Sequence, residues 1–117
     1  MKYIKKFELK IVEKLEVGDY VQMYQKLNTS GKKYKFFIDN HISKIMDIYD
    51  GIVVLLTYEN IPEDLLFEFR EIKIGDIIFN GKWFNILDIV EHGKTKEDVK
   101  LKIQSKKYNL WKNIYNL

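Results

Sequence analysis

The stretch KIGDIIFNGKWFNILDI, from Lys73 to Ile89, decides the fold class of the chain. Apolar and polar residues alternate on both sides of Asn80-Gly81, as they do in strands that bury one face. An Asn-Gly pair between two such runs is the strongest short-range signal of a β-hairpin. The stretch therefore predicts paired strands with a turn at Asn80-Gly81.

The last four residues of this stretch, ILDI at Ile86 to Ile89, closely match an earlier segment of the chain, IMDI at Ile45 to Ile48. A Gly-Asp pair precedes each segment, at Gly75-Asp76 and at Gly18-Asp19. A fixed order of short strands that recurs in one chain points to two similar units that pack together. We therefore expect a mostly β protein with at most short helices, made of two related small SH3-like or partial barrel units.

These two units divide the chain into residues 1–59 and residues 67–117, with residues 60–66 as a linker or short helix. Pro62, followed by two acidic residues, fits the start of such a helix. The apolar run from Ile52 to Tyr58 predicts a fully buried strand. We expect Val53 to Leu56 to pack against Ile86 to Ile89 and join the halves.

Several further segments carry strand patterns. They are rich in β-branched or aromatic residues, or alternate apolar with polar residues. These segments are Phe7 to Ile11, Tyr20 to Leu27, Tyr34 to Ile38, Ile42 to Ile48, Phe67 to Ile74 and Val99 to Gln104. Tyr49-Asp50-Gly51 predicts a turn.

Composition limits the classes of function. The chain has 117 residues, 46% of them hydrophobic and 32% charged, which suits one small folded domain or two very small ones that share a core. It contains no cysteine, so disulfides, thiolate nucleophiles and cysteine metal sites are excluded. No apolar run reaches the roughly 20 residues that span a bilayer. We expect a cytoplasmic protein without a membrane segment.

Catalytic and metal-binding motifs are not evident. The two histidines, His41 and His92, show no metal-ligand spacing, so no metal or other cofactor is expected. Asp47 and Asp88 hold matching places in the repeat, where each fits the outward position of an alternating strand. The serines lack a base partner or a nucleophile elbow. The sequence predicts that the protein is not an enzyme.

Two clusters mix lysines with aromatic residues, one near the middle of the first half and one near the end of the chain. Cations neutralise phosphates and flat rings stack on unpaired bases, so such clusters suit single-stranded nucleic acid. The alternative is that the rings fill the core and the lysines face water. The candidate nucleic-acid-binding residues are Lys32, Lys33, Tyr34, Lys35, Lys106, Lys107, Tyr108, Trp111 and Lys112.

The centre of the chain is acidic. Residues 47–76 hold eight acidic and two basic side chains, whereas the segments on either side of residues 47–93 are basic. A carboxylate surface can occupy a basic groove on another protein. This alternative assigns protein binding to Glu63, Asp64, Glu68 and Glu71.

The segment GDIIFNGKWFNILDI, Gly75 to Ile89, resembles the Gly-Asp, strand, Gly-Lys-Trp, strand hairpin of SH3-like small barrels, including those of phages and mobile elements. The lysine–aromatic clusters and the lack of catalytic motifs lead us to expect a non-enzymatic binding protein, encoded by a phage or mobile element, that contacts nucleic acid or a nucleic-acid-associated protein. One alternative is a phage-encoded inhibitor of a host defence nuclease, of the anti-CRISPR kind, which would bind a host protein. Another is a structural joining protein of a virion.

Overall fold

The computed structural model describes residues 15–25 and 31–115, with side chains up to residue 107. The strand predicted at Phe7 to Ile11 lies outside these residues. In chain order the described elements are β1 (Tyr20–Met23), α2 (Gly31–Asp39), β2 (Ile42–Tyr49), β3 (Val53–Tyr58), η1 (Glu63–Glu68), β4 (Arg70–Ile74), β5 (Ile77–Asn85), η2 (Ile86–Asp88), β6 (Ile89–Gly93) and α3 (Lys96–Tyr115). The expectation of a mostly β protein is confirmed.

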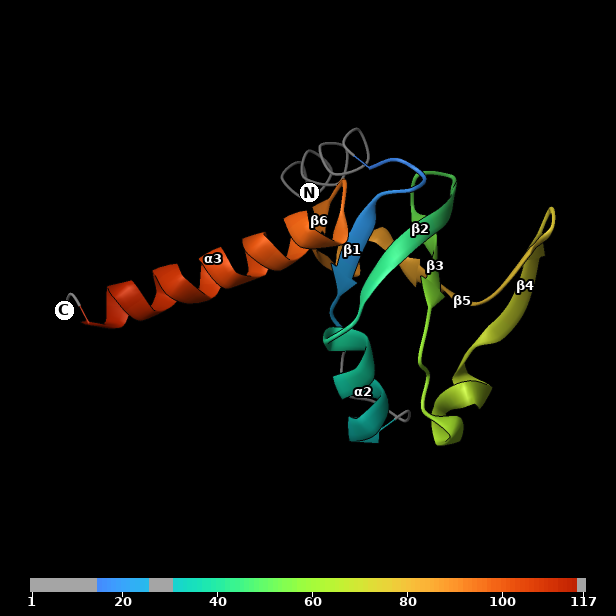
Figure 1. Cartoon of the computed structure of the whole chain (residues 1–117), viewed down its shortest axis with the longest axis horizontal. Helices are drawn as coiled ribbons and strands as arrows, with labels where there is room; N and C mark the ends of the chain where they lie inside the picture. The colour runs from blue at the N-terminus through green and yellow to red at the C-terminus, as the bar shows by residue number, and fades with distance from the viewer. Residues whose placement is uncertain (1–14, 26–30, 116–117) are drawn as a thin grey trace.

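The strands form one antiparallel sheet in the order β4-β5-β3-β2-β1-β6 (Figure 1). The sheet consists of two groups of strands, β6-β1-β2 and β2-β3-β5-β4, and β2 belongs to both groups. Residues Ile42–Lys44 pair with β1, and residues Ile45–Tyr49 pair with β3. A register shift between Ile45 and Asp47 lies near the change of partner. A bulge bends and twists a strand, so it allows β2 to turn the corner between the two groups of strands.

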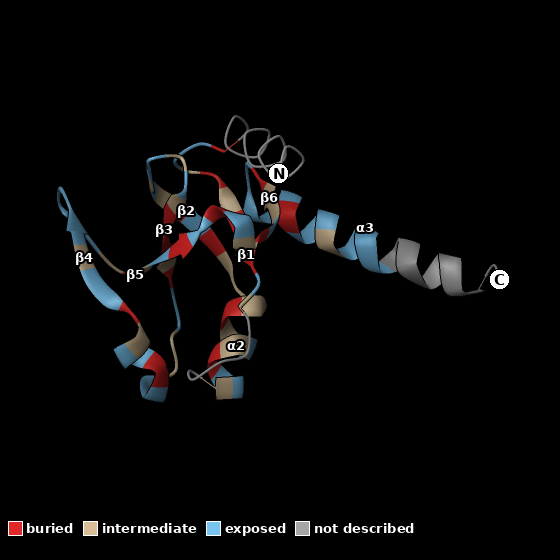
Figure 2. Ribbon diagram, turned by 180° about the vertical axis from the view of Figure 1, so that it is seen from behind, coloured by how far each residue is buried: buried red, intermediate tan, exposed pale blue. Residues whose placement is uncertain are grey.

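The core lies on the inner face of this bent sheet, and Figure 2 shows its buried residues gathered along the central strands. β3 supplies Val54, Leu56 and Tyr58 at every second position, as predicted for a central strand. α2 closes the core with Tyr34 and Ile38, which lie four residues apart on one helical face.

The structure does not confirm two repeated units. The first of the two similar segments, Ile45 to Ile48, lies in β2, whereas most of the second, Ile86–Asp88, is the 3₁₀ helix η2 and only Ile89 begins a strand. Strands from the two expected halves also pair directly, β3 with β5 and β1 with β6. One sheet therefore contains strands from both halves, and the two similar sequence segments adopt different secondary structures.

The turn predicted at Asn80-Gly81 is wrong. Both residues lie inside β5, and the hairpin between β4 and β5 turns at Gly75-Asp76, where Gly75 has φ +61°. The surroundings of Gly81 are crowded: a Cβ there would lie 2.8 Å from Phe79 Cε2, 2.9 Å from Ile72 Cδ1 and 3.2 Å from the backbone oxygen of Leu56. An interior strand glycine of this kind marks close packing.

Two segments with strand patterns are helical. Tyr34 to Ile38 lies in α2, and Val99 to Gln104 lies in α3. α3 begins after Thr95, whose Oγ1 accepts a hydrogen bond of 3.1 Å from the backbone N–H of Asp98. This hydrogen bond caps the N-terminus of α3. The alternating apolar residues from Val99 to Gln104 do not form a buried strand face, since Val99 is buried but Leu101 is 62% exposed. Among the described residues, no helix has the length and apolar character needed to span a bilayer.

Gly93 fixes the contact between β6 and α3. A Cβ at this position would lie 2.8 Å from the Cβ of Asp98 and 3.3 Å from Cγ2 of Val99. We expect Gly93→Ala to push the first turn of α3 outward and to lower the free energy of unfolding by about 1–3 kcal/mol, as overpacking does. Chemical denaturation measures this loss. Val90→Ala, in the same strand but 46% exposed, is the control and should change stability by less than about 0.5 kcal/mol.

Candidate functional site

A groove of about 490 Å³ lies where η1, β4 and β5 meet. It is lined by Phe67, Glu68, Arg70, Ile72, Gly81, Lys82 and Trp83, a set called the aromatic groove below. Its volume falls within the range of pockets that hold small organic groups. Phe67 is 79% exposed and Trp83 is 44% exposed, so both rings offer surface to a ligand.

The aromatic groove adjoins an open edge of the sheet. β4 pairs with β5 from Arg70 opposite Gly81 to Ile74 opposite Ile77. Beyond Gly81, β5 continues to Asn85 with β3 on one side, and no described strand pairs with its other side. The backbone of Lys82–Asn85 along this edge is therefore available to a ligand as hydrogen-bond donors and acceptors. Gly81 lies in the floor of the groove, where the side chains of Ile72 and Phe79 approach its backbone.

Lys82 is held in place at the rim of the groove. Its Nζ lies 3.1 Å from Oε2 of Glu68 and 4.4 Å from the ring centroid of Tyr34. Burial raises the pKa of the Tyr34 hydroxyl, although the nearby Lys82 works against this rise. Arg70, in contrast, is exposed and forms no ion pair with the described residues. Within the described part of the chain, Arg70 thus lines the groove without an ion pair, whereas Lys82 is held by Glu68.

The first predicted nucleic-acid cluster lies on α2. Tyr34 is 1% exposed and packs with its ring centroid 6.3 Å from that of Phe69, so it cannot stack on a base in the folded protein. Lys33 pairs with Asp64, and Lys35 pairs with Asp39, while Lys32 faces solvent. α2 therefore uses its aromatic residue for the core and two of its lysines for ion pairs.

The second predicted cluster lies on α3, which extends away from the sheet on the side opposite the β4–β5 hairpin (Figure 1). Nζ of Lys106 lies 2.7 Å from Oε2 of Glu91 and donates to the backbone oxygen of Val90. Lys107 is exposed. Tyr108, Trp111 and Lys112 lie in α3, but their side chains are outside the described part of the chain. The two predicted clusters thus lie on separate helices, α2 and α3.

The four acidic residues assigned to protein binding lie on η1 and β4. Two of them are paired within the molecule, Asp64 with Lys33 at 2.6 Å and Glu68 with Lys82. The hydrogen bond from Lys33 lowers the pKa of Asp64. Glu63 and Glu71 are exposed and form no ion pair with the described residues. The carboxylate surface is therefore about half neutralised by its own chain.

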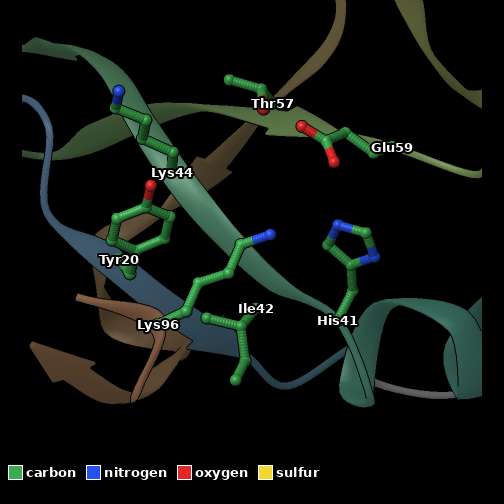
Figure 3. Close-up of a pocket in the computed structure, with 7 residues that line it drawn as sticks. All are labelled: Tyr20, His41, Ile42, Lys44, Thr57, Glu59 and Lys96. Carbon is green, nitrogen blue, oxygen red and sulfur yellow. The ribbon is translucent and has the colours of Figure 1, made fainter. Parts of the chain in front are cut away.

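A second, smaller cavity lies on the other side of β3. It has a volume of about 70 Å³ and is called the His41 cavity (Figure 3). Its residues come from β1, β2, β3 and α3, from the turn between α2 and β2, and from the residue that follows β3. They are Tyr20, His41, Ile42, Lys44, Thr57, Glu59 and Lys96.

His41 forms one wall of this cavity and also packs on the core. Its ring centroid lies 5.1 Å from that of Phe37 and 4.9 Å from that of Tyr58. Burial lowers the pKa of His41, the nearby Lys96 lowers it further, and Glu59 opposes the change. The folded protein therefore favours the neutral ring.

This preference makes stability depend on pH. As pH falls below the ordinary histidine value of about 6.5, the unfolded chain takes up a proton that folded His41 takes up only at lower pH, so folding loses stability. We expect His41→Phe, which keeps an aromatic ring, to lose less stability than the parent between about pH 7 and pH 5. Urea unfolding across this interval measures the difference, and equal losses in both proteins would contradict the assignment to His41.

Sequence reasoning missed most of the aromatic groove. The sequence predicts Lys82 and Trp83 as strand residues and as part of the Gly-Lys-Trp of an SH3-like hairpin, and it predicts no binding role for Phe67 or Arg70. The register of β4 against β5 brings Arg70 opposite Gly81, and this pairing could not be found while Gly81 was read as a turn. Among the side chains that the structure describes, in residues 15–25 and 31–107, no group of three or more acidic, histidine or cysteine side chains is arranged to hold a metal ion.

Comparison of the chain with models of protein families, with curated proteins and with solved structures finds no match in any of the three.

Proposed function

We propose that this chain is a non-enzymatic binding protein of phage or mobile-element type that holds single-stranded nucleic acid in the aromatic groove. The observation that carries the proposal is the meeting of two exposed rings, Phe67 and Trp83, around one groove with Arg70, which has no ion-pair partner among the described residues. The groove has room for a base, which the His41 cavity has not.

The pairing of strands supports a single small barrel of the SH3-like kind. β1 lies between β2 and the last strand β6, and the short helix η2 connects β5 to β6. β2 is shared by the two groups of strands and bends between them. In this proposal the β4 strand and η1 are an addition between β3 and β5, and this addition builds the groove.

The chemistry of the groove matches the needs of a single strand. Stacking of bases on aromatic rings contributes about 1–3 kcal/mol per base and tolerates any sequence. Arg70 and Lys82 can each neutralise a phosphate, although Lys82 shares its charge with Glu68. The open edge of β5 adds backbone groups that can meet the polar edges of unstacked bases.

The dependence of affinity on salt tests this function. Fluorescence anisotropy of a labelled single-stranded oligonucleotide should show a fall of log K against log salt with a slope of about −1.4 if two phosphates are neutralised, and Arg70→Gln should reduce the slope by about 0.7. Lys73→Gln, on the same strand, is the matched control and should leave the slope unchanged. Absence of binding at low salt would end the proposal.

The lysine clusters on α2 and α3 remain a separate prediction. Three of the four lysines Lys33, Lys35, Lys106 and Lys107 form ion pairs. We therefore expect the combined substitution of these four by glutamine to weaken binding of the same oligonucleotide less than Arg70→Gln does. The same anisotropy titration decides this, because a larger loss in the fourfold variant would place the main contact on the helices.

One observation favours the joining role in a virion as a second candidate. The β4–β5 hairpin exposes three isoleucines, Ile74 at 41%, Ile77 at 57% and Ile78 at 60%. Exposed apolar side chains grouped on a projecting hairpin are typical of contacts between proteins. This function predicts assembly at high concentration that is lost when the three isoleucines are replaced by threonine. Light scattering that finds a monomer at every concentration would exclude self-assembly.

A further inference from the structure

We propose that the outer edge of β4 is an interface between two copies of this chain, which pair their β4 strands antiparallel about Ile72. The paired strands join the two sheets into one. Glu71 of each copy then forms an ion pair with Lys73 of the other copy. This pairing does not require the aromatic groove to bind nucleic acid.

The outer edge of β4 is open. β4 lies at one end of the strand order, and among the described strands it pairs only with β5. Figure 1 shows it at the end of the sheet farthest from α3. All of its residues except Ile72 are exposed. The outward backbone N–H and C=O groups of β4 can therefore accept a further strand.

Symmetry limits how two β4 strands can pair. Two identical antiparallel strands in one sheet are related by a two-fold axis perpendicular to the sheet, so each residue points to the same face in both copies. Residues directly opposite each other also point to the same face. Because side chains alternate between the faces, these conditions hold together only when one residue of β4 lies opposite itself.

A centre at Ile72 pairs the whole of β4 and matches its charges. Glu71 then lies opposite Lys73 of the second copy, twice across the interface, and Arg70 lies opposite Ile74. A centre at Arg70, Glu71 or Lys73 places two like charges directly opposite each other, which is unfavourable. A centre at Ile74 leaves most of the strand unpaired. The sequence of β4 is thus complementary to itself in one register.

Glu71 and Lys73 have no partner of opposite charge within the described residues. Both are exposed, and neither forms an ion pair there. Their neighbours on β5 are Asn80 and Ile78, which carry no charge. Since Ile72, between them, lines the aromatic groove, the two charged side chains lie on the other face of the strand. They are available to a second copy without closing the groove.

Isoleucines add apolar contact on the groove face of the paired strands. Ile72 of the two copies meets at the axis, and Ile74 of each copy is its diagonal neighbour across the interface. Ile74 is 41% exposed, and Ile77, which pairs with it on β5, is 57% exposed. Exposed apolar side chains grouped in this way are typical of surfaces that contact another protein.

The interface closes at two copies and is small. Each copy uses its one β4 edge, so the contact is the same on both sides and leaves no edge of β4 for a third copy. A pair of five-residue strands buries less surface than the interface of a permanent dimer. We therefore expect a dimer whose population depends on concentration.

Sedimentation equilibrium of the full chain, from about 10 μM to about 1 mM, tests this pairing. The average mass should rise from that of one chain toward that of two. Glu71→Lys and Lys73→Glu should each weaken dimerisation by about 10- to 100-fold, because either change turns both ion pairs into like-charge contacts. Lys44→Glu makes the same change of charge at an exposed position of β2, so it is the matched control and should dimerise as the parent does.

Mixing the two variants separates charge pairing from damage to the fold. In an equal mixture of the Glu71→Lys and Lys73→Glu chains, every pair across the interface is again of opposite charge. The mixture should therefore form a mixed dimer about as readily as the parent forms its own. The double variant, with both changes in one chain, should recover dimerisation for the same reason.

Three results would overturn the proposal. They are a chain that stays monomeric to about 1 mM, an assembly larger than a dimer, and single variants that associate as the parent does. The last result would place self-assembly on other residues, such as the exposed isoleucines alone. No oligonucleotide is present in these measurements, so the pairing of β4 and the proposed function can fail separately.

Discussion

Replacing Trp83 by alanine is expected to weaken binding of a single-stranded oligonucleotide by about 5- to 150-fold, because one stacked base contributes about 1–3 kcal/mol. Phe67→Ala should cause a loss of the same order. The two rings line one groove, so a strand that lies in it should stack a base on each of them. Anisotropy titrations of the two single variants and of the double variant measure these losses.

Two controls separate stacking from general damage. Phe36 is 70% exposed on α2 and Tyr49 is 67% exposed on β2, and neither lines the groove. Alanine at these positions should leave affinity near that of the parent, and thermal unfolding should show that all variants fold. A double groove variant that binds as tightly as the parent would contradict the assignment of the groove.

Replacing Leu56 by alanine is expected to have the largest effect on stability. Leu56 is 0% exposed at the centre of β3, between Ile45 of β2 and Lys82 of β5. Removing its buried methyl groups leaves a cavity, and such substitutions cost about 2–5 kcal/mol. A domain of this size has only about 5–15 kcal/mol of stability, so the loss should be plain in denaturant unfolding.

Leu56→Met is the matched control, because it keeps the volume and should cost less than about 1.5 kcal/mol. Thr57→Ala, one residue along and half-buried on the other face, should also cost little. If Leu56→Ala lost no more than Thr57→Ala, the inner face of β3 would not be the packed face, and the register of the central strands would be wrong.

The central strands could be predicted because the apolar residues of their sequences occupy the positions that are buried in the structure. β2 and β3 carry apolar residues on the face that packs, and the turn between them uses Asp50 and Gly51, both with positive φ. Gly18 and Gly75 likewise occupy turns with positive φ. The strand pattern and the turn glycines are determined by residues close together in the sequence, so the sequence alone can predict them.

The features that were missed depend on contacts between distant residues. Gly81 looks like a turn residue after Asn80, but the side chains of Ile72 and Phe79 explain it, and they pack against it only after β4 pairs with β5. Tyr34 looked available for stacking because its place in α2 and its burial against Phe69 depend on tertiary packing. Two repeated units are not confirmed, because the similar segments Ile45–Ile48 and Ile86–Asp88 lie in different elements, β2 and η2.

The aromatic groove could be predicted only in part. Lys82 and Trp83 are adjacent in the sequence, and a lysine beside an aromatic residue is the same pattern that predicts nucleic-acid binding at the other two clusters. Its other wall comes from Phe67 and Arg70, more than ten residues earlier, at the end of η1 and the start of β4. Only the antiparallel register joins the two walls.

The intrinsic fluorescence of Trp83 tests the central claim most directly. The chain has two tryptophans, so Trp111→Phe leaves Trp83 as the single reporter. Stacking of a base on the indole should quench its emission, and the quenching should saturate at the same oligonucleotide concentration as the anisotropy. Emission from Trp83 that stays unchanged while the oligonucleotide is fully bound would show that the strand lies elsewhere, and would contradict the proposed site.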